Sequence, residues 1–521
     1  MIAAVTRLAT LAQANGTEVQ PIETPSIDWS ALWPGLILVV GAILLITVAS
    51  VAKRWLFTGF YATWTVLVGL GAIAASIPLW NEVQDGDGPF SAVANAVGVD
   101  GFSVFVTVVI AGAVVLCALL ADGYLRREGM DGPELYVLML LSAAGGVIMA
   151  SANDLIVAFL GLEVLSISVY VLAAMHRKRT TSQEAGVKYF VLGAFSSAFF
   201  LYGIAMVYGA TGSTNMVDIS QFLANEVLLQ DSVLLIGFAF LLVGFAFKIA
   251  AVPFHFWTPD VYQGAPTPVS AFMASAVKVA GFAGLIRVFT LTFSTYGDEW
   301  EPLVQALCLL TLLVGALLAV VQTDVKRMMA YSSINHAGFI LLGVEAATAE
   351  GTSAALFYLA VYTFMVIGTF GVLTVVSRQG DELTSLDDLK GLAGSKPVLA
   401  FLFTVFLLAQ AGVPLTAGFF AKFYVLEAAV DASSYWLALI AMLTAVISAF
   451  LYLRIIVSMY MGAADGDDPL PELEGPEVKV PWAAGVALAV CLAVTLFVGF
   501  FPQHLVDLAN EAVPVLVATA P

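Results

Sequence analysis

Long uninterrupted apolar runs restrict what this chain can fold into more than any other feature of its sequence. About fourteen segments each hold roughly 18 or more mostly apolar residues, enough for a helix to cross the hydrocarbon of a bilayer. A large soluble core would need polar stripes between its apolar segments, and most segments have none. Only 11% of the residues are charged, whereas a soluble domain keeps about a quarter of its residues charged. The chain is therefore predicted to be an all-α, polytopic membrane protein.

The predicted helices divide the chain into five regions. We expect helices at 32–51, 59–80, 99–122, 133–150, 154–174, 185–210, 232–263, 266–293, 301–322, 327–346, 352–376, 397–430, 435–461 and 480–502. The regions are a tail (1–30), helices 1–3 (31–130), a first repeat of helices 4–8 (131–295), a second repeat of helices 9–13 (296–462), and an acidic loop with the last helix and a C-terminal tail (463–521).

The seventh and twelfth predicted helices are longer than one crossing needs, and each contains an internal proline. The runs are Ala250–Pro253 and Ala411–Pro414. Proline removes a backbone donor and clashes with the preceding turn, so both helices should break there. Interrupted helices at matching places in two halves are typical of inverted-repeat transporters. We therefore predict two inverted five-helix repeats; the alternative is a chance likeness of two Val-Pro pairs in an Ala- and Val-rich chain.

Basic residues predict the orientation of the chain in the membrane. They gather in alternate loops as Lys53, Arg54, Arg126, Arg127, Arg177, Lys178, Arg179, Lys326, Arg327, Arg378, Lys390, Lys396 and Lys479. The other loops hold none, and the N-terminal tail has only Arg7. Because basic loops stay in the cytoplasm, we expect both termini on the extracytoplasmic side. The first 30 residues have no proper apolar h-region, so a cleaved signal peptide is not expected.

Basic residues also occur inside apolar segments, where a central charge costs roughly 2.5–3.5 kcal/mol on insertion scales. They are Lys188, Lys248, Lys278, Arg287, Lys422 and Arg454. Arg287 and Arg454 are expected to reach the headgroups from helix ends, an account that fits Lys188 less well. It fails for Lys248, Lys278 and Lys422, which lie near the proline breaks or at mid-helix. Because burial disfavours the ammonium form, these three lysines are predicted to exchange protons.

Glu163 is an acidic residue well inside its predicted helix, and Ser166 and Tyr170 extend a polar stripe on the same face. A carboxylate in lipid needs a partner, for which Lys248 or Lys188 is the natural candidate. Separating such a pair would let each group trade its proton. The alternative is a static ion pair that holds two helices together, but this alternative does not explain why further lysines continue beyond the pair.

Two histidines could relay protons between the lysines. His255 follows the Pro253 break, and His336 lies on the tenth predicted helix; a simply hydrogen-bonded histidine is the alternative for each. The sequence has no Walker loop and no haem or metal spacing, and its three cysteines form no CxxC pair. We therefore expect no cofactor or metal in this chain and no nucleic-acid partner. Its work is predicted to be the movement of an ion, with the proton as the favoured cargo.

Five segments together resemble the antiporter-like membrane subunits of respiratory complex I, the proton-pumping NADH:quinone oxidoreductase. They are Lys248–Thr267, Glu163, Ala185–Phe190, Tyr331–Ile334 and Gly418–Lys422. The resemblance covers essentially residues 32–502 and is closest to the N-type members. Lys422 stands where M-type members typically carry a glutamate, and the chain ends soon after its last helix, without the long lateral helix of L-type members. The plastid counterpart is also similar, and a bacterial origin is favoured.

The resemblance implies proton translocation through one half-channel in each repeat, driven by redox chemistry in other subunits. Glu163 and Lys248 would serve the first half-channel, Lys278 would link inward, and Lys422 would serve the second. NADH, FMN, iron–sulfur clusters and quinone would be bound elsewhere in the complex. Expected neighbours are an M-type subunit, small membrane subunits such as the K-type, and the lipid of a bacterial cell membrane. Alternatives are an M-type subunit, a subunit of a multi-subunit cation/proton antiporter, or a membrane scaffold.

Overall fold

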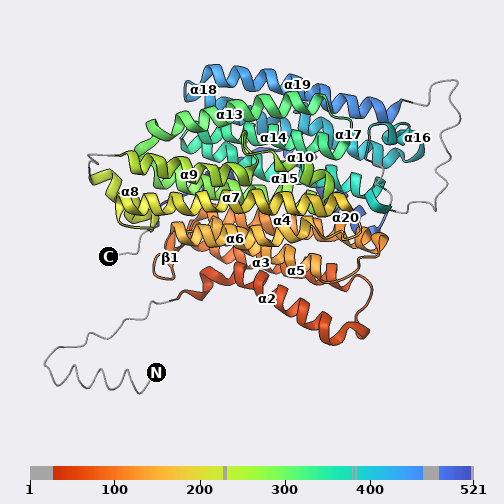
Figure 1. Ribbon diagram of the computed structural model, residues 1–521, viewed down its shortest axis with the longest axis horizontal. Helices are drawn as coiled ribbons and strands as arrows, with labels where there is room; N and C mark the ends of the chain where they lie inside the picture. Colours follow the sequence, from red (N-terminus) through yellow and green to blue (C-terminus); the bar gives the residue numbers. More distant parts are fainter. Residues whose placement is uncertain (1–26, 227–230, 378, 382–383, 462–479, 518–521) are drawn as a thin grey trace.

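The computed structural model describes residues 27–226, 231–377, 379–381, 384–461 and 480–517. Predictions on the tail before residue 27, on Arg378 and on the acidic loop with Lys479 fall outside these residues. Figure 1 shows the helices lying side by side as one bundle. The all-α fold is confirmed.

The described chain is almost entirely helical. The α-helices are α2 (Trp29–Ala52), α3 (Phe60–Asp85), α4 (Gly101–Glu128), α5 (Glu134–Ala150), α6 (Leu155–Ala173), α7 (Thr180–Thr211), α8 (Met216–Asn225), α9 (Ser232–Ile249), α10 (Trp257–Gly264), α11 (Thr267–Phe272), α12 (Lys278–Ile286), α13 (Gly297–Val320), α14 (Val325–Glu345), α15 (Ala349–Val376), α16 (Leu392–Ser395), α17 (Pro397–Ala411), α18 (Ala417–Asp431), α19 (Tyr435–Tyr460), α20 (Trp482–Phe500) and α21 (Gln503–Glu511). The short elements are the 3₁₀ turns η1 (Lys53–Trp55), η4 (Ser294–Tyr296), η5 (Gln379–Asp381) and η6 (Asp387–Leu389), the π-helical turns η2 (Met273–Val277) and η3 (Arg287–Thr292), and an antiparallel pair of strands, β1 (Phe90–Ala92) and β2 (Val97–Val99).

Every predicted segment coincides with a helix or with a run of consecutive helical elements, but fewer of these are long and apolar enough to cross a bilayer. Eleven helices in the described residues qualify, or up to twelve if the bent pair Asp387–Ser395 and Pro397–Ala411 is one span. Helix α5 falls short at 17 residues, and α14, which carries the polar run Tyr331–His336, is not among the eleven. The number of about fourteen crossings therefore stays a prediction.

Both predicted helix breaks are present. Helix α9 ends at Ile249 because Ala250 takes a left-handed conformation (φ 64°), and the chain resumes as α10 at Trp257. Helix α17 ends at Ala411, where Gly412 has φ 90°, and α18 begins at Ala417. The left-handed residues terminate the first half of each broken helix, and the prolines that follow prevent its continuation.

The two halves share a local motif at opposite ends of the bundle. Asp154 caps α6 and accepts a hydrogen bond from the Thr214 hydroxyl over 2.7 Å. Asp324 caps α14 and accepts from the Thr384 hydroxyl over 2.5 Å. Figure 1 places α8, which follows Thr214, at the left end of the bundle and α16, which follows Thr384, at the right end. This arrangement supports the inverted relation of the two halves.

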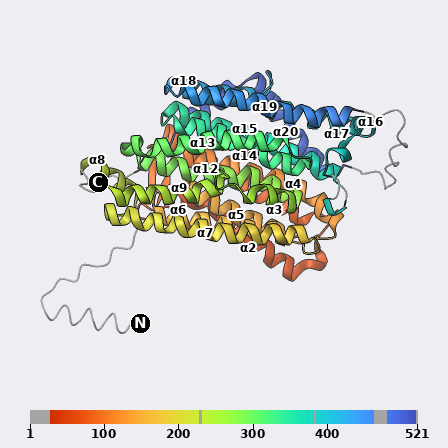
Figure 2. The same ribbon diagram turned by 45° about the horizontal axis from the view of Figure 1, so that its top comes forward.

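The helices at the centre of the bundle are enclosed by protein. All residues in the most apolar 18-residue stretch of Thr267–Thr292 are buried. In the corresponding stretch of α15, 94% of the residues are buried. Figure 2 shows α14 and α15 between α19 on one side and α2 on the other. A charged side chain on these central helices therefore cannot reach headgroups or water by extending outward.

Basic ends of several helices converge on Asp381 in the turn after α15. Its carboxylate lies 3.2 Å from Arg179, 3.5 Å from Lys326 and 3.7 Å from Arg127. Burial raises the pKa of Asp381, but the neighbouring cations, Lys326 first, outweigh burial and hold the pKa below its ordinary value. Three of the basic residues predicted for alternate loops, Arg127, Arg179 and Lys326, thus meet at one end of the bundle.

Candidate functional site

The first centre surrounds Lys248, one residue before the end of α9. The side chain is 3% exposed, and its Nζ donates to the Ser166 hydroxyl of α6 over 2.7 Å. The rings of Tyr170 and Tyr189 lie 5.6 and 5.7 Å from the same nitrogen. Cation–π contacts stabilise the ammonium, and the hydroxyl gives its proton a neutral acceptor.

Glu163 does not form the predicted direct ion pair with Lys248 or Lys188. Ser166, which follows Glu163 by three residues on the same helix face, accepts the Lys248 hydrogen bond. The Glu163 carboxylate is still close enough for its charge to act on Lys248. Its Oε1 atom is buried and has no hydrogen-bond partner in the described part of the chain, so the carboxylate is available to receive a proton.

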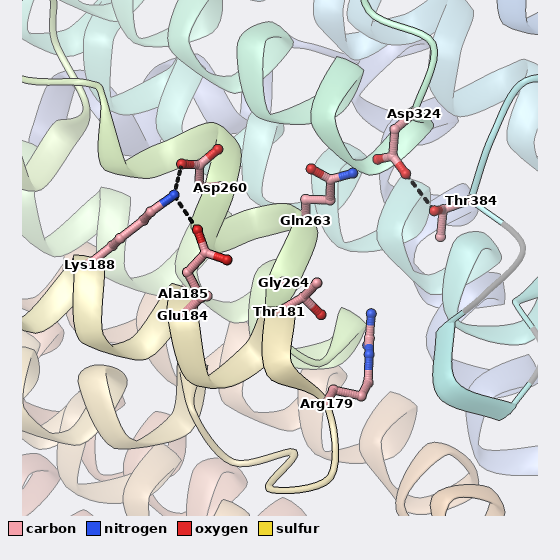
Figure 3. Close-up of a pocket in the computed structure, with 10 residues that line it drawn as sticks. All are labelled: Arg179, Thr181, Glu184, Ala185, Lys188, Asp260, Gln263, Gly264, Asp324 and Thr384. Atoms are coloured by element: carbon pink, nitrogen blue, oxygen red, sulfur yellow. Dashed lines mark hydrogen bonds and ion pairs between the residues drawn. The ribbon is translucent and has the colours of Figure 1, made fainter.

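Lys188, on α7, pairs with carboxylates other than Glu163. Its Nζ lies 2.6 Å from Glu184 and 2.6 Å from Asp260 of α10. The second Asp260 oxygen accepts from Arg327 at the start of α14 over 2.6 Å. Lys188, Glu184 and Asp260 line a polar cavity of about 220 Å³, shown with the Lys188 contacts in Figure 3. Because the Lys188 side chain is 41% exposed, this cavity opens at the surface of the bundle.

Lys278 lies at the centre of the bundle, at the start of α12. The π-helical turn η2 ends at the residue before it, and π-helical turns often mark functional positions. The side chain is 2% exposed, and its Nζ donates to the Ser333 carbonyl oxygen over 2.5 Å and to the Ser333 hydroxyl over 2.6 Å. Lys278 therefore connects the first half to α14 of the second half.

His336 extends the polar contacts along α14, three residues after Ser333. Its Nδ1 atom is 2.7 Å from the Tyr358 hydroxyl, and its Nε2 atom is 3.0 Å from the Tyr452 hydroxyl. Tyr452 in turn contacts the Ser332 hydroxyl over 2.6 Å. An imidazole with a hydroxyl at each nitrogen can accept a proton on one side and release one on the other.

Lys422 occupies the second broken helix, on α18. It is 7% exposed, donates to the Ala411 carbonyl oxygen over 2.8 Å, and has the Phe339 ring 5.1 Å from Nζ. The acceptor is free because α17 stops at Ala411 and leaves its last carbonyl groups without helical partners. The φ of 90° at Gly412 favours glycine, and an added Cβ atom would lie 3.0 Å from the Lys422 side chain.

The remaining predicted residues have mixed outcomes. His255 is 5% exposed, and its Nδ1 atom has no hydrogen-bond partner. Arg454 donates to the carbonyl groups of Val320 and Gln322 at the end of α13. The prediction that Arg287 reaches the headgroups is wrong: it is fully buried and pairs with Asp100 over 2.6 Å, because its helix is enclosed by protein.

Sequence reasoning missed several residues that complete the site. The segment Lys248–Thr267 contains Asp260, for which no role was predicted, although a carboxylate in a broken helix itself indicates a functional position. Tyr452 and Gln410, which contact Ser332, are polar residues in apolar runs and could have been found by that criterion. Their connection to α14 follows only from tertiary packing.

Within the described ranges, no group of three or more His, Cys, Asp or Glu side chains is arranged to hold a metal ion. Cys117, Cys308 and Cys491 are buried and unpaired. The polar residues that converge are lysines, hydroxyls, one histidine and carboxylates, which are groups that exchange protons.

Comparisons with known proteins support the same interpretation. Residues 152–448 match the family described as "NADH:quinone oxidoreductase/Mrp antiporter, TM". The chain is 40% identical to NADH-quinone oxidoreductase subunit N 3 of Streptomyces griseus, with 94% of each chain covered. It is 41% identical to NADH-quinone oxidoreductase subunit N of Trichlorobacter lovleyi, with 94% of this chain and 98% of the relative covered.

Solved structures show the same architecture. A chain of respiratory complex I from Thermus thermophilus is 32% identical, with a TM-score of 0.74 over 92% of this chain and 99% of that one. A chain of the Mrp complex from Dietzia is 22% identical, with a TM-score of 0.81 over 94% of this chain and 97% of that one, which shows a shared fold. Taken with the matched family and the curated relatives, these findings establish that the chain belongs to the NADH:quinone oxidoreductase/Mrp antiporter transmembrane family, among the N subunits of bacterial NADH-quinone oxidoreductase.

Proposed function

We propose that this chain is a proton-translocating subunit of NADH:quinone oxidoreductase. The observation that carries the proposal is that Lys248, Lys278 and Lys422 are all buried and all donate to neutral oxygen atoms. None of the three forms an ion pair with a described carboxylate. A lysine held in this way can lose its proton without leaving an unpaired buried carboxylate behind, which makes charge movement less costly.

The proposed route enters at the polar cavity beside Lys188 and Asp260. Protons then pass to the Glu163, Ser166 and Lys248 centre, with His255 beside the break as a relay group. Lys278 and Ser333 link this centre to α14, and His336 with its tyrosine partners leads towards Lys422. Redox energy released in other subunits would drive the transfer.

We place the end of the bundle that carries Asp381 and its basic neighbours in the cytoplasm, because basic loops are retained there. Both termini then lie on the extracytoplasmic side, and the five regions predicted from the sequence are retained, with the two repeats at 131–295 and 296–462. The chain would lie in a bacterial cell membrane beside an M-type subunit and small K-type subunits. NADH, FMN, iron–sulfur clusters and quinone would be handled by subunits other than this one.

Replacing Lys278 with methionine tests the proposed route. In whole complex reconstituted into vesicles, we expect NADH-driven proton uptake to fall about tenfold or more, because a positioned proton-transfer group contributes at least that much. The complex should still assemble, since methionine fills a similar volume. Arg454→Gln is the matched control. Arg454 is also a basic residue in an apolar helix, but it donates to the backbone carbonyl groups of Val320 and Gln322 and has no place in the proposed route.

The same vesicles distinguish two other functions. Transport that follows sodium instead of protons would support a cation/proton antiporter, which the fold shared with the Mrp complex keeps as the second candidate. Unchanged pumping by Lys278→Met, together with poor assembly, would support a structural scaffold and contradict the proposal.

Asp260→Asn tests the entry cavity separately. Removing the charge that joins Lys188 to Arg327 should slow NADH:quinone turnover severalfold at limiting proton supply, while leaving the amount of assembled complex unchanged. Turnover as a function of external pH is the measurement. The expected result is a loss that is largest at high pH, where protons are scarce; a loss of equal size at all pH values would argue against an entry role.

A further inference from the structure

A second cavity, of about 650 Å³, opens at the basic end of the bundle and plays no part in the proposed proton route. It lies between α2, the turn from α4 to α5, and the end of α6. Its apolar wall consists of Ile46, Val137, Leu138, Val171, Ala174 and Met175. Because these residues belong to the ends of helices and the rim belongs to turns, the cavity crosses the boundary between hydrocarbon and headgroups.

An exposed apolar stripe on α6 leads into this cavity. Leu160, Val164, Ile167 and Val171 are 54%, 40%, 58% and 52% exposed. Their spacing of three and four residues places them on one face of the helix. Val171 also lines the cavity, so the stripe and the cavity form one continuous apolar surface that matches an extended acyl chain.

The rim of the cavity carries opposite charges on its two sides. Asp131 and Glu134 come from the turn between α4 and α5, and Arg177 and Lys178 come from the turn between α6 and α7. All four residues are exposed, and none of them forms an ion pair within the described residues. The rim is therefore balanced in charge and open to a ligand with both a cationic and an anionic group.

His176 supplies a buried polar atom at the same place. It is 7% exposed and lines the cavity. Its Nε2 atom lies 3.3 Å from the Glu128 carboxylate, while Nδ1 has no hydrogen-bond partner among the described residues. A buried polar atom without a partner is costly, and a bound headgroup would satisfy it.

We propose that this cavity binds a phospholipid with a zwitterionic, ammonium-bearing headgroup, of the phosphatidylethanolamine type. The phosphate contacts Arg177 and Lys178, the ammonium contacts Asp131 and Glu134, and an acyl chain follows the α6 stripe. A purely anionic headgroup would place its charge beside two carboxylates, and like charges repel. Basic pockets at the cytoplasmic side of transmembrane helices are a recognised mode of headgroup binding, to which this rim adds a site for the cation.

Lipid retention by the purified whole complex tests the proposal. Mass spectrometry counts the phosphatidylethanolamine molecules that remain after a mild detergent wash. Val171→Trp should fill the cavity mouth and lose about one molecule per complex, without disturbing the core, since Val171 is largely exposed. Val191→Trp, at an exposed valine of α7 that belongs neither to the α6 stripe nor to the cavity lining, is the matched control and should retain it.

A second variant tests the headgroup. Asp131→Asn with Glu134→Gln leaves the rim positive, so complex exchanged into vesicles of mixed phosphatidylethanolamine and phosphatidylglycerol should change from retaining the former to retaining the latter. Equal retention by the two tryptophan variants, or a preference of the wild type for phosphatidylglycerol, would overturn the proposal. So would unchanged lipid with loss of a neighbouring subunit in Val171→Trp, because that result assigns the cavity to a protein partner. None of these readouts depends on proton pumping.

Discussion

Lys248→Ala is expected to reduce proton pumping coupled to NADH oxidation by about tenfold or more, because a positioned proton-transfer group contributes at least that factor. The lysine is the one buried cation that contacts both the Glu163 helix and the first helix break in the described structure. Alanine leaves Ser166 without its donor and Glu163 without the nearby positive charge. Proton uptake and quinone reduction, measured together in vesicles, check the result.

Lys248→Arg distinguishes proton exchange from simple charge neutralisation. Arginine keeps the positive charge but does not release its proton in a protein. If Lys248 exchanges protons, the arginine variant should assemble normally and pump almost as poorly as the alanine variant. Full pumping by Lys248→Arg would show that a fixed charge is sufficient, and the proposed role of Lys248 would then be wrong.

Arg287→Met is expected to have the largest effect on stability. Arg287 and Asp100 are both fully buried and lie 2.6 Å apart. Removing one partner of a buried pair leaves an uncompensated charge and costs about 3–5 kcal/mol. Asp100 also accepts from the backbone N–H groups of Ser103 and Val515, so its disturbance would loosen both the start of α4 and the C-terminal segment. The amount of assembled complex in membranes and its aggregation temperature should both fall.

The double variant Arg287→Met with Asp100→Asn isolates the electrostatic part of this loss. Asparagine keeps a side-chain oxygen for the α4 cap and loses only the longer, 3.2 Å hydrogen bond from the Val515 N–H, and no buried charge remains. Assembly should therefore recover to near the wild-type level. If the double variant is as unstable as Arg287→Met alone, the loss comes from packing against Phe102, whose ring lies 5.2 Å from the guanidinium.

The sequence predicted those features that depend on residues close together in the chain. Apolar length indicated the membrane class, and prolines with their preceding residues located both breaks, which the structure places at Ala250 and Gly412. Lysines in apolar surroundings were identifiable as candidates because their cost in hydrocarbon is independent of the final fold. The structure shows Lys248, Lys278 and Lys422 buried within the bundle.

Partners and burial could not be predicted in the same way. The lipid and the protein interior are both apolar, so the sequence of an apolar helix does not indicate which of the two it faces. For that reason Arg287 was expected at the headgroups, although its helix proved to be enclosed. The same limit applies to the choice of Ser166 over Glu163 as the acceptor for Lys248, and of Asp260 for Lys188, since each contact joins helices that only packing brings together.

Sequence alone thus determined that the chain crosses a membrane, where two helices break and which lysines carry an energetic cost, because each is a local property of the chain. Tertiary structure alone decided which oxygen atom each lysine contacts and which charges are sealed from lipid. The physical reason is that hydrogen bonds act over about 3 Å. Lys248 and Ser166 are 82 residues apart in the sequence, and Lys278 and Ser333 are 55 apart, so each pair comes within that distance only when its helices pack together.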